Sequence, residues 1–357
     1  MLVTPLITGF SGSLGASAAV MGMIGGLMNM CALFCRPFVG NLADRISKYK
    51  LSFIGAFLMA VACLGYLLSP NPASVVFFRI VNGVGFACCS VCMSTWMSNM
   101  LPREKVGAGM GVYGMMNALG MAIAPAVGVS VYQAFGYRAA FGVALACPVG
   151  TMLVIQLIRD KGEPEAVLPQ GRGLQVADRR VLPIAAIIML FAIPYCATQS
   201  FLVSYVEDRQ LNVSVSWFFP LYAAALLLLR LCLRNWFDRL PFPVFLAGSS
   251  VCALGGILAL SQMNSYGVML FAAVCMAGGY GIMCSVCQST AILLAGKGKR
   301  GLANSTYYIG LDLGMTLGPV TGGFLYGHLD LTWFYPALLL TVPLEILVYL
   351  LFMRKKA

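Results

Sequence analysis

The stretch Arg36–Arg45, RPFVGNLADR, places two arginines and an aspartate in and beside an apolar run. It recurs at an offset of 194 residues as Arg230–Arg239, RLCLRNWFDR, so that Arg36, Asp44 and Arg45 each have an identical counterpart. The same offset relates Gly85 to Gly279, Gly107 to Gly301, Gly120 to Gly314, Gly128 to Gly322, Pro125 to Pro319 and Lys105 to Lys299. Charges and prolines are costly near lipid, so the pattern indicates an internal duplication rather than chance. Two tandem membrane halves are typical of transporters that rock one half against the other.

Composition places the chain among helical membrane proteins. Hydrophobic residues make up 60% of the sequence and charged residues only 10%, and the mean hydropathy is +0.87. A soluble domain carries about 25% charged residues, so an ordinary globular protein is excluded. Lipid admits only helices or closed barrels, and the apolar stretches have the length of about 20 residues that a helix needs. We therefore expect an all-α polytopic membrane protein with two pseudo-symmetric helical bundles.

Eleven apolar spans are expected. They cover residues 16–43, 50–69, 73–100, 106–133, 138–158, 182–206, 214–237, 243–262, 266–295, 301–327 and 331–353. Alternate connections then lie on opposite sides of the membrane, and one side holds 18 of the 23 lysines and arginines. The positive-inside rule makes that side cytoplasmic and places the C-terminus there. The net charge of +11 is thus a topology signal of an inner (plasma) membrane protein, and it does not indicate nucleic-acid binding.

The two halves are expected to differ at their beginnings. Residues 1–10, MLVTPLITGF, are apolar but only half a span long, and the turn-like SGSLGAS follows. We expect that the front of a first span is missing, and a half-length re-entrant segment is the alternative. Residues 160–181 carry Pro and Gly breakers and both charge signs, which predicts a cytoplasmic linker. The chain then divides into 1–159, an N-terminal bundle with a truncated first span, and 182–357, a six-helix C-terminal bundle.

Metal and cofactor chemistry finds little support in the sequence. The 13 cysteines lie almost entirely in apolar spans, where thiols behave as small hydrophobic groups. Cys89 and Cys92, like Cys284 and Cys287, have the spacing of zinc or redox pairs, but the only histidine is His328 at the outer end of a span. No zinc-type histidine pair and no nucleophile–base arrangement is visible. We expect no metal, no cofactor and no enzyme activity.

The loop after the first full span carries the tract Gly40–Lys50, GNLADRISKYK. Glycine, small or apolar residues, Asp-Arg and a basic cluster in this order resemble the loop signature of the major facilitator superfamily. Ser47 departs from that signature, because it stands where the family usually has glycine. The resemblance covers almost the whole chain and implies the major-facilitator fold, in which the front of the first helix is the missing part.

The resemblance also implies a gating role for the two Asp-Arg loops. The expected gating residues are Gly40, Asp44, Arg45, Glu104, Asp238 and Arg239. Asp44 is expected to contact the start of the eleventh helix, near residues 301–304, because the positive end of a helix attracts a carboxylate. Arg45 is expected to pair with a carboxylate near the end of the fourth helix, and Glu104 is the candidate. The alternative is that the basic residues of the loop only anchor it to anionic lipid.

A pattern of glycines and a proline marks the fifth helix of the family scheme and recurs in the eleventh. It consists of Gly111, Gly120, Pro125 and Gly128 and, in the second half, of Gly314, Gly318, Pro319 and Gly322. The first set is similar to the signature of proton-driven antiporters in the superfamily, which favours export over import. Small residues at these spacings line one helix face and permit close packing, while proline adds a bend.

Two charged residues lie well inside spans. Arg79 falls in the outer half of one span and Asp312 near the middle of another. An ionisable group at membrane depth is a functional-site candidate by default, so both are candidates for proton coupling. The alternatives are that Arg79 snorkels to the outer headgroups and that Asp312 is a neutral acid bonded to a neighbouring helix. Snorkelling and packing are the expected roles of Arg36 and Arg230 at inner span ends, and Glu345 is expected to be paired near the cytoplasmic rim.

The superfamily fold implies a central cavity lined by the first, fourth, seventh and tenth helices. The candidates for substrate contact are Tyr195, Gln199 and Tyr205 on the seventh helix, Tyr280 and Gln288 on the tenth, and Asn117 on the fifth. These features together predict a monomeric transporter that exports a small organic molecule (drug-like, sugar or metabolite) against inward proton flow. A proton-coupled importer of a sugar or organic anion is one alternative. A non-transporting sensor or inactive truncated transporter is the other.

Overall fold

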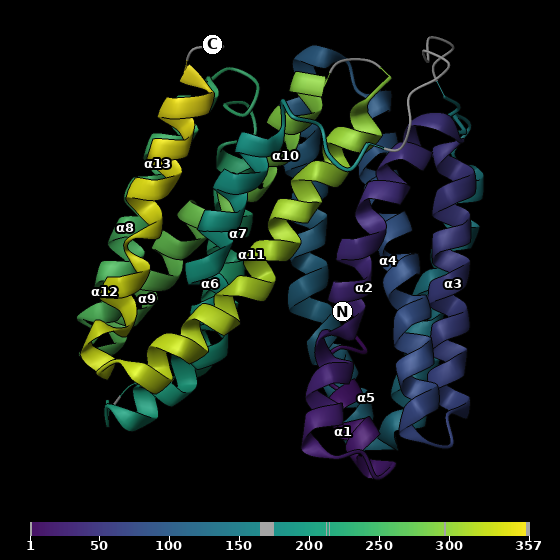
Figure 1. Cartoon of the computed structure of the whole chain (residues 1–357), viewed down its shortest axis with the longest axis horizontal. Helices are drawn as coiled ribbons and strands as arrows, with labels where there is room; N and C mark the ends of the chain where they lie inside the picture. The colour runs from purple at the N-terminus through teal and green to yellow at the C-terminus, as the bar shows by residue number, and fades with distance from the viewer. Residues whose placement is uncertain (1, 165–174, 212, 214, 296–297, 355–357) are drawn as a thin grey trace. The chain divides into compact units, whose positions relative to one another are not determined.

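The computed structural model describes residues 2–164, 175–211, 213, 215–295 and 298–354. The helices are α1 (Ile7–Ser13), α2 (Ala18–Arg45), α3 (Lys48–Leu68), α4 (Pro72–Met100), α5 (Val106–Val154), α6 (Leu182–Asp208), α7 (Phe218–Cys232), α8 (Phe242–Ser261), α9 (Tyr266–Met276), α10 (Ile282–Ala295), α11 (Arg300–His328), α12 (Phe334–Leu338) and α13 (Thr341–Phe352) (Figure 1). No strand occurs within the described ranges, so the expected all-α fold is confirmed. The middle of the expected linker, residues 165–174, lies outside the described residues.

Many of the helices have the length and composition of membrane spans. In the part of the chain that the structure describes, eight helical stretches are long and apolar enough to cross a membrane, and α7 is a shorter apolar helix. Large apolar side chains such as Phe34, Phe77 and Phe135 are mostly exposed, at 70%, 60% and 77%. Lipid can cover such side chains, whereas water could not do so without cost. The expected number of eleven spans stays a prediction.

Short polar residues set where the helices of the first half begin. Ser17 and Ser47 each accept a hydrogen bond through Oγ from the backbone N–H three residues on, at 3.5 and 3.4 Å. Asn71 does the same before α4, through Oδ1 and at 2.9 Å. These side chains satisfy N–H groups that have no partner inside a helix, so they fix the starts of α2, α3 and α4.

Two interruptions occur where a uniform helix would be expected. α5 is broken at Gly136, whose φ of 81° and ψ of 178° are readily adopted only by glycine. The break falls between the expected spans 106–133 and 138–158, so α5 consists of two helical segments. The second interruption is a π-helical segment, Ala277–Gly281, that joins α9 to α10. Such segments carry an extra residue in one turn and often occur at functional sites.

The chain forms two compact units. Unit 1 comprises Met1–Met100, Leu119–Ala177 and Gly296–Ser305, and unit 2 comprises Leu101–Ala118, Asp178–Ala295 and Thr306–Ala357. α5 and α11 therefore each contribute residues to both units. Within unit 1, α4 packs against both α2 and α3 (Figure 1), and α1 packs on α2. Within unit 2, α8 packs against α9 and α6 against α13.

The core of unit 1 anchors the short helix α1. Ile7 and Phe10 of α1 are buried together with Ile24, Tyr66 and Phe141, which come from α2, α3 and α5. The ring of Phe10 meets the ring of Phe141 edge-on, with 4.9 Å between centroids. Residues 2–10 of the half-length apolar segment therefore contribute to this unit's core.

Candidate functional site

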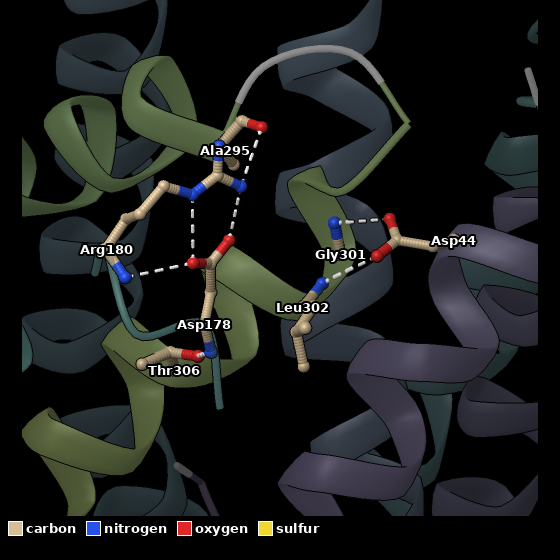
Figure 2. Close-up of polar contacts among 7 residues, drawn as sticks. All are labelled: Asp44, Asp178, Arg180, Ala295, Gly301, Leu302 and Thr306. Atoms are coloured by element: carbon tan, nitrogen blue, oxygen red, sulfur yellow. Dashed lines mark hydrogen bonds and ion pairs between the residues drawn. The ribbon is translucent and has the colours of Figure 1, made fainter. Parts of the chain in front are cut away.

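Asp44, in the last turn of α2, caps the N-terminus of α11. Its Oδ1 accepts a hydrogen bond from the Gly301 N–H at 2.7 Å, and its Oδ2 accepts one from the Leu302 N–H at 3.0 Å (Figure 2). The first N–H groups of a helix lack partners within it and carry the positive end of its dipole. A carboxylate is therefore well matched to this position, which is the one that the family resemblance implies.

The contact at Asp44 depends on two glycines that face each other. A Cβ on Gly40 would lie 2.8 Å from the Ser305 Oγ and 3.2 Å from the Gly301 carbonyl oxygen. A Cβ on Gly301 would lie 2.7 Å from the Gly40 carbonyl oxygen. Because the nearest atoms include backbone, a side chain at either position would push α2 away from the start of α11.

The second Asp-Arg loop makes the equivalent contact inside unit 2. The Asp238 Oδ1 accepts a hydrogen bond from the Ala108 N–H at 2.9 Å, at the start of α5. A Cβ on Gly107 would lie 2.6 Å from the same carboxylate oxygen. The offset of 194 residues that relates Asp44 to Asp238 also relates the two capped helix starts. The duplication thus preserves the contact as well as the residues.

The two loops differ in how the preceding helix ends. α2 continues to Arg45, whereas α7 ends at Cys232 and residues 233–240 form turns. The expected span 214–237 is therefore too long at its end. Arg234 stands at the repeat position of Gly40, and a bulky side chain there excludes the close backbone approach that Gly40 permits.

The arginines of the two loops lie at the surface. Arg45, Arg239 and Glu104 are all exposed, and Glu104 lies in the short turn Arg103–Lys105 before α5. The pairing of Arg45 with Glu104 stays a prediction.

A polar seam between α4 and the start of α11 was not anticipated from the sequence. Asn304 donates through Nδ2 to the Thr95 Oγ1 at 3.2 Å and also to the Ser94 Oγ. Arg300 donates through Nη1 to the Ser98 carbonyl at 2.5 Å. The sequence feature that could have predicted this seam is the run of small polar residues near the C-terminal end of α4. The seam holds the same helix start that Asp44 caps.

The two repeated arginines are buried, so of the two roles expected for them they pack inside the protein and do not snorkel. Arg36 is 0% exposed and Arg230 is 6% exposed. Arg36 donates to the Ser90 Oγ, and its guanidinium lies 5.5 Å from the centroid of the Phe86 ring. Arg230 donates through Nη2 to the Gly281 carbonyl at 2.8 Å. Neighbouring helices supply these partners inside the protein, and the side chains therefore do not reach for the membrane surface.

Arg79 joins α4 to α2 in the core of unit 1. It is 1% exposed, and it donates through Nε to the Ile24 carbonyl and through Nη2 to the Gly25 carbonyl, both at 3.0 Å. The alternative in which Arg79 snorkels to the outer headgroups is therefore excluded. Its part in proton coupling stays a prediction.

Asp312 is buried on α11, with 5% of its surface exposed. Its backbone carbonyl accepts a hydrogen bond from the Thr316 Oγ1 at 2.8 Å. Asp312 follows Gly310 by two residues, about 200° around the helix, so it lies on the side of α11 opposite to Gly310. Its proposed role in proton coupling remains to be tested.

One face of α11 is a row of glycines that packs directly on α6. A Cβ on Gly314 would lie 2.6 Å from the Cβ of Ala192, and one on Gly318 would lie 2.6 Å from the Cβ of Cys196. One turn further on, a Cβ on Gly322 would lie 2.9 Å from the ring of Phe201. These positions admit no side chain without moving the helices apart. Pro319 lies inside the same helix.

The matching row on α5 is packed less evenly. A Cβ on Gly128 would lie 2.6 Å from the Leu2 carbonyl oxygen, and one on Gly111 would lie 3.2 Å from the ring of Phe237. Around Gly120, by contrast, a Cβ would meet no described atom within 4 Å beyond its own turn. The repeated sequence motif therefore has different packing in its two copies. Pro125 lies inside α5.

The structure brings together two of the expected substrate contacts and adds a third residue. The rings of Tyr195 and Tyr280 stack with 4.4 Å between centroids. The third residue, Tyr222, was not among the expected contacts; its ring centroid lies 4.9 Å from that of Tyr195. Gln288 lies on α10 and donates through Nε2 to the Tyr308 Oη at 3.1 Å. The three tyrosines form an aromatic cluster within unit 2.

The other expected contacts lie apart from this cluster. The Tyr205 Oη accepts a hydrogen bond from the Arg209 Nη1 at 2.7 Å, and its ring meets Tyr335 edge-on at 4.8 Å. Gln199 and Asn117 are exposed. Tyr205 is thus held by its own neighbours near the end of α6.

Glu345 is buried between α13 and α8, where its hydrogen-bond partner is a serine; its expected place near the cytoplasmic rim stays a prediction. It is 1% exposed, and its Oε1 accepts a hydrogen bond from the Ser250 Oγ at 2.8 Å. A carboxyl in such a place is stabilised by a hydrogen-bond donor and by remaining uncharged. Sequence distance to the nearest basic residue gave no information about this burial.

One described end of the linker binds the loop after α2, and the other binds the last turns of α2 itself. The Ser47 Oγ donates to the Lys161 carbonyl at 2.6 Å. Asn41 exchanges two hydrogen bonds with Gln175, donating at 2.6 Å and accepting at 3.2 Å. The departure from the family signature at Ser47 therefore supplies both a cap for α3 and an attachment for the linker.

Asp178 and Arg180 fix the point at which the chain enters unit 2. The Arg180 Nη2 lies 2.7 Å from the Asp178 Oδ2 and also donates to the Ala295 carbonyl at 3.1 Å. The Asp178 N–H donates to the Thr306 Oγ1 at 2.9 Å (Figure 2). The hydrogen bonds to Asp178 raise the pKa of Arg180, which therefore stays charged.

The fold and the site together describe a helical membrane protein built from two repeated halves, with capped helix starts and glycine-packed helices. Repeated membrane halves of this kind are typical of secondary transporters. The sequence profile of the Major Facilitator Superfamily matches residues 1–319 and 214–357. The chain therefore belongs to the major facilitator superfamily and is a multi-pass membrane transporter.

Three known proteins illustrate the similarity. An uncharacterized MFS-type transporter of Methanocaldococcus jannaschii is 20% identical, covering 93% of this chain and 89% of its own. The multi-drug resistance efflux pump PmrA of Streptococcus pneumoniae is 24% identical over 57% of this chain and 50% of its own. The crystal structure of the superfamily transporter FucP in the outward conformation matches with a TM-score of 0.78 at 13% identity, covering 97% of this chain and 94% of that one. At this identity the structural likeness shows the fold alone.

Proposed function

We propose that this protein is a proton-coupled exporter of small organic molecules that works by alternating access in the cell inner membrane. The observation that carries the proposal is the pair of helix caps at Asp44 and Asp238. Hydrogen bonds to a charged group contribute about 1.5–3 kcal/mol each. The caps can therefore stabilise one conformational state, and they are few enough to break during the transport cycle. A transporter needs two states that differ by only a few kcal/mol, because a larger gap would trap one of them.

The halves that rock in this scheme are residues 1–159 and 182–357, with the C-terminus on the cytoplasmic side. The uneven distribution of lysine and arginine supports this orientation. The antiporter-like pattern on the fifth helix favours export, and the efflux pump PmrA is a distant relative with that activity in its name. The second candidate is proton-coupled import, because the fold of the superfamily serves transport in either direction.

Asp312 and Arg79 are the proposed groups of the coupling machinery. Asp312 is a buried carboxyl inside a span that has no acidic counterpart in the first half, where Ala118 occupies the repeat position. A group that is kept by only one half after duplication suits a specialised task such as binding and releasing a proton. Arg79 ties α4 to α2 and would set how these helices move together.

Transport into membrane vesicles tests the proposal. A growth screen with toxic organic compounds first identifies one whose toxicity the protein reduces. Inverted vesicles carrying an acid-inside proton gradient should then accumulate that compound and lose it when a protonophore is added. Accumulation in right-side-out vesicles instead would establish import, and none in either orientation would favour the non-transporting alternative. Asp312→Asn should abolish gradient-driven accumulation, whereas Glu345→Gln, at the other buried carboxyl, should retain it.

A further inference from the structure

Arg230 lies buried in unit 2 with most of its hydrogen-bonding capacity unused. Its Nη2 donates to the Gly281 carbonyl at 2.8 Å, and its side chain is 6% exposed. Its Nε and Nη1 have no hydrogen-bond partner among the described residues. A guanidinium carries five N–H donors, and these two nitrogens account for three of them. A buried charge in this condition is costly until a partner compensates it.

A second donor without a partner lies beside Arg230. The Ser285 Oγ on α10 belongs to a residue that is 2% exposed, and nothing in the described part of the chain bonds to it. A Cβ on Gly114 of α5 would lie 2.5 Å from this oxygen and 2.9 Å from the Arg230 Nη1. The two polar atoms therefore both pack against the backbone of the same glycine.

The titratable groups of the described residues that act most on Arg230 are thiols and phenols. The titratable side chains that influence it are Cys284, Tyr222, Tyr307 and Tyr280. Thiols and phenols are neutral at neutral pH, so none of them offsets the guanidinium charge. The site is thus a buried positive charge in neutral surroundings, which favours an anionic partner.

Aromatic side chains adjoin the charge. Tyr222 and Arg230 lie two turns apart on one face of α7, and this face packs on the π-helical segment Ala277–Gly281. A Cβ on Gly281 would lie 3.1 Å from the Tyr222 Oη, and the Gly281 carbonyl is the atom that Arg230 bonds. Tyr280, in the same segment, stacks on Tyr195. Aromatic faces beside a fixed charge suit an organic ligand whose body is apolar.

We propose that Arg230 and Ser285 bind the carboxylate of an aromatic organic acid whose ring contacts Tyr195, Tyr222 and Tyr280. This inference rests on the proposed transport function and names its substrate class. Guanidinium N–H groups and a hydroxyl are the donors that a carboxylate accepts most strongly. The bond from Nη2 to Gly281 orients the guanidinium and leaves the other nitrogens for the ligand.

Calorimetric titration of the purified protein in detergent tests the site. The probes are benzoate and salicylate, and benzamide serves as the uncharged isostere of benzoate. Benzoate should bind at least tenfold more tightly than benzamide. Arg230→Gln should weaken benzoate about 10- to 100-fold, the loss expected for charged hydrogen bonds, and Ser285→Ala should weaken it about 3- to 10-fold. Arg234→Gln removes the same charge from an exposed residue four positions further on and should change nothing.

The controls separate binding from folding and from transport. Size-exclusion profile and melting temperature report whether Arg230→Gln folds, and if it does not, Ser285→Ala and Arg230→Lys carry the test. Equal benzoate affinity in these variants and the wild type would overturn the inference, as would the absence of binding by either acid to the wild type. The titration needs no proton gradient, so a negative result would overturn the binding site without contradicting proton-coupled export. Conversely, Arg230-dependent binding without gradient-driven transport would overturn the proposed export function and leave the binding site standing.

Discussion

Gly40 of α2 and Gly301 of α11 face each other so closely that a Cβ on Gly301 would lie 2.7 Å from the Gly40 carbonyl oxygen. This contact brings the Asp44 carboxylate onto the first N–H groups of α11. Its counterpart at Asp238 joins a turn to the start of α5 and uses one hydrogen bond where Asp44 uses two. The two caps are therefore related by sequence but differ in their number of hydrogen bonds.

Asp44→Asn should impair transport more than Asp238→Asn does. Asparagine retains one carbonyl acceptor but loses the charge and one of the two hydrogen bonds, which costs about 1–3 kcal/mol in the state that the cap stabilises. At Asp238 the single bond can still form. The measurement is the initial transport rate in vesicles, where a roughly tenfold or greater loss is expected for Asp44→Asn and a smaller one for Asp238→Asn. Equal losses would show that the two caps contribute alike.

Gly314→Ala and Gly120→Ala should have opposite effects although they are repeat counterparts. A Cβ at Gly314 would lie 2.7 Å from the Met189 carbonyl oxygen on α6, so the helices must separate at a cost of about 1–3 kcal/mol. At Gly120 the added methyl meets open space, and alanine favours the helix by up to about 1 kcal/mol. Melting temperatures in detergent should fall for the first variant and stay level or rise for the second. A fall for both would show that the α5 row packs as tightly as the α11 row.

Ser47→Gly restores the residue of the family signature and should loosen the linker. The change removes the hydrogen bond to the Lys161 carbonyl, worth about 1 kcal/mol, while glycine remains acceptable as a helix cap. Trypsin should therefore cleave after Lys161 several-fold faster. Ser47→Thr keeps the hydroxyl and serves as the control. Unchanged cleavage in Ser47→Gly would mean that other contacts hold this end of the linker.

Glu345→Gln should leave stability nearly unchanged, whereas Glu345→Ala should lower it by about 1–3 kcal/mol. Glutamine preserves the acceptor for the Ser250 hydroxyl, but alanine leaves that hydroxyl buried without its partner and opens a cavity. Thermal unfolding in detergent distinguishes these outcomes. Ser250→Ala combined with Glu345→Ala should cost less than the sum of the two single changes, because the pair is lost together.

The sequence was informative where the chemistry is local. The resemblance of the Asp-Arg tract to the family signature implied a carboxylate near residues 301–304, and Asp44 lies there because a helix start attracts a negative charge. The gap between two apolar runs located the break of α5, since only a glycine such as Gly136 adopts a positive φ without strain.

Burial and helix register could not be predicted in the same way. Arg36, Arg230 and Glu345 were placed at span ends, but whether a polar group meets lipid headgroups or another helix depends on which side of the helix faces a neighbour. The π-helical segment at 277–281 is invisible to apolar periodicity, because one extra residue shifts the pattern by less than one turn. Tyr222 was missed because its contact with Tyr195 depends on which side of α7 faces α6.

The second described end of the linker is attached at two points that lie close together along the chain. Gln175 is bonded to Asn41 in unit 1 and Asp178 to Thr306 in unit 2. Three residue steps separate these anchors, and a fully extended chain spans at most about 3.6 Å per residue, or roughly 11 Å in total. The chain therefore has little slack between Gln175 and Asp178. Asn41→Ala removes the first of these attachments and frees the described end of the linker up to Asp178.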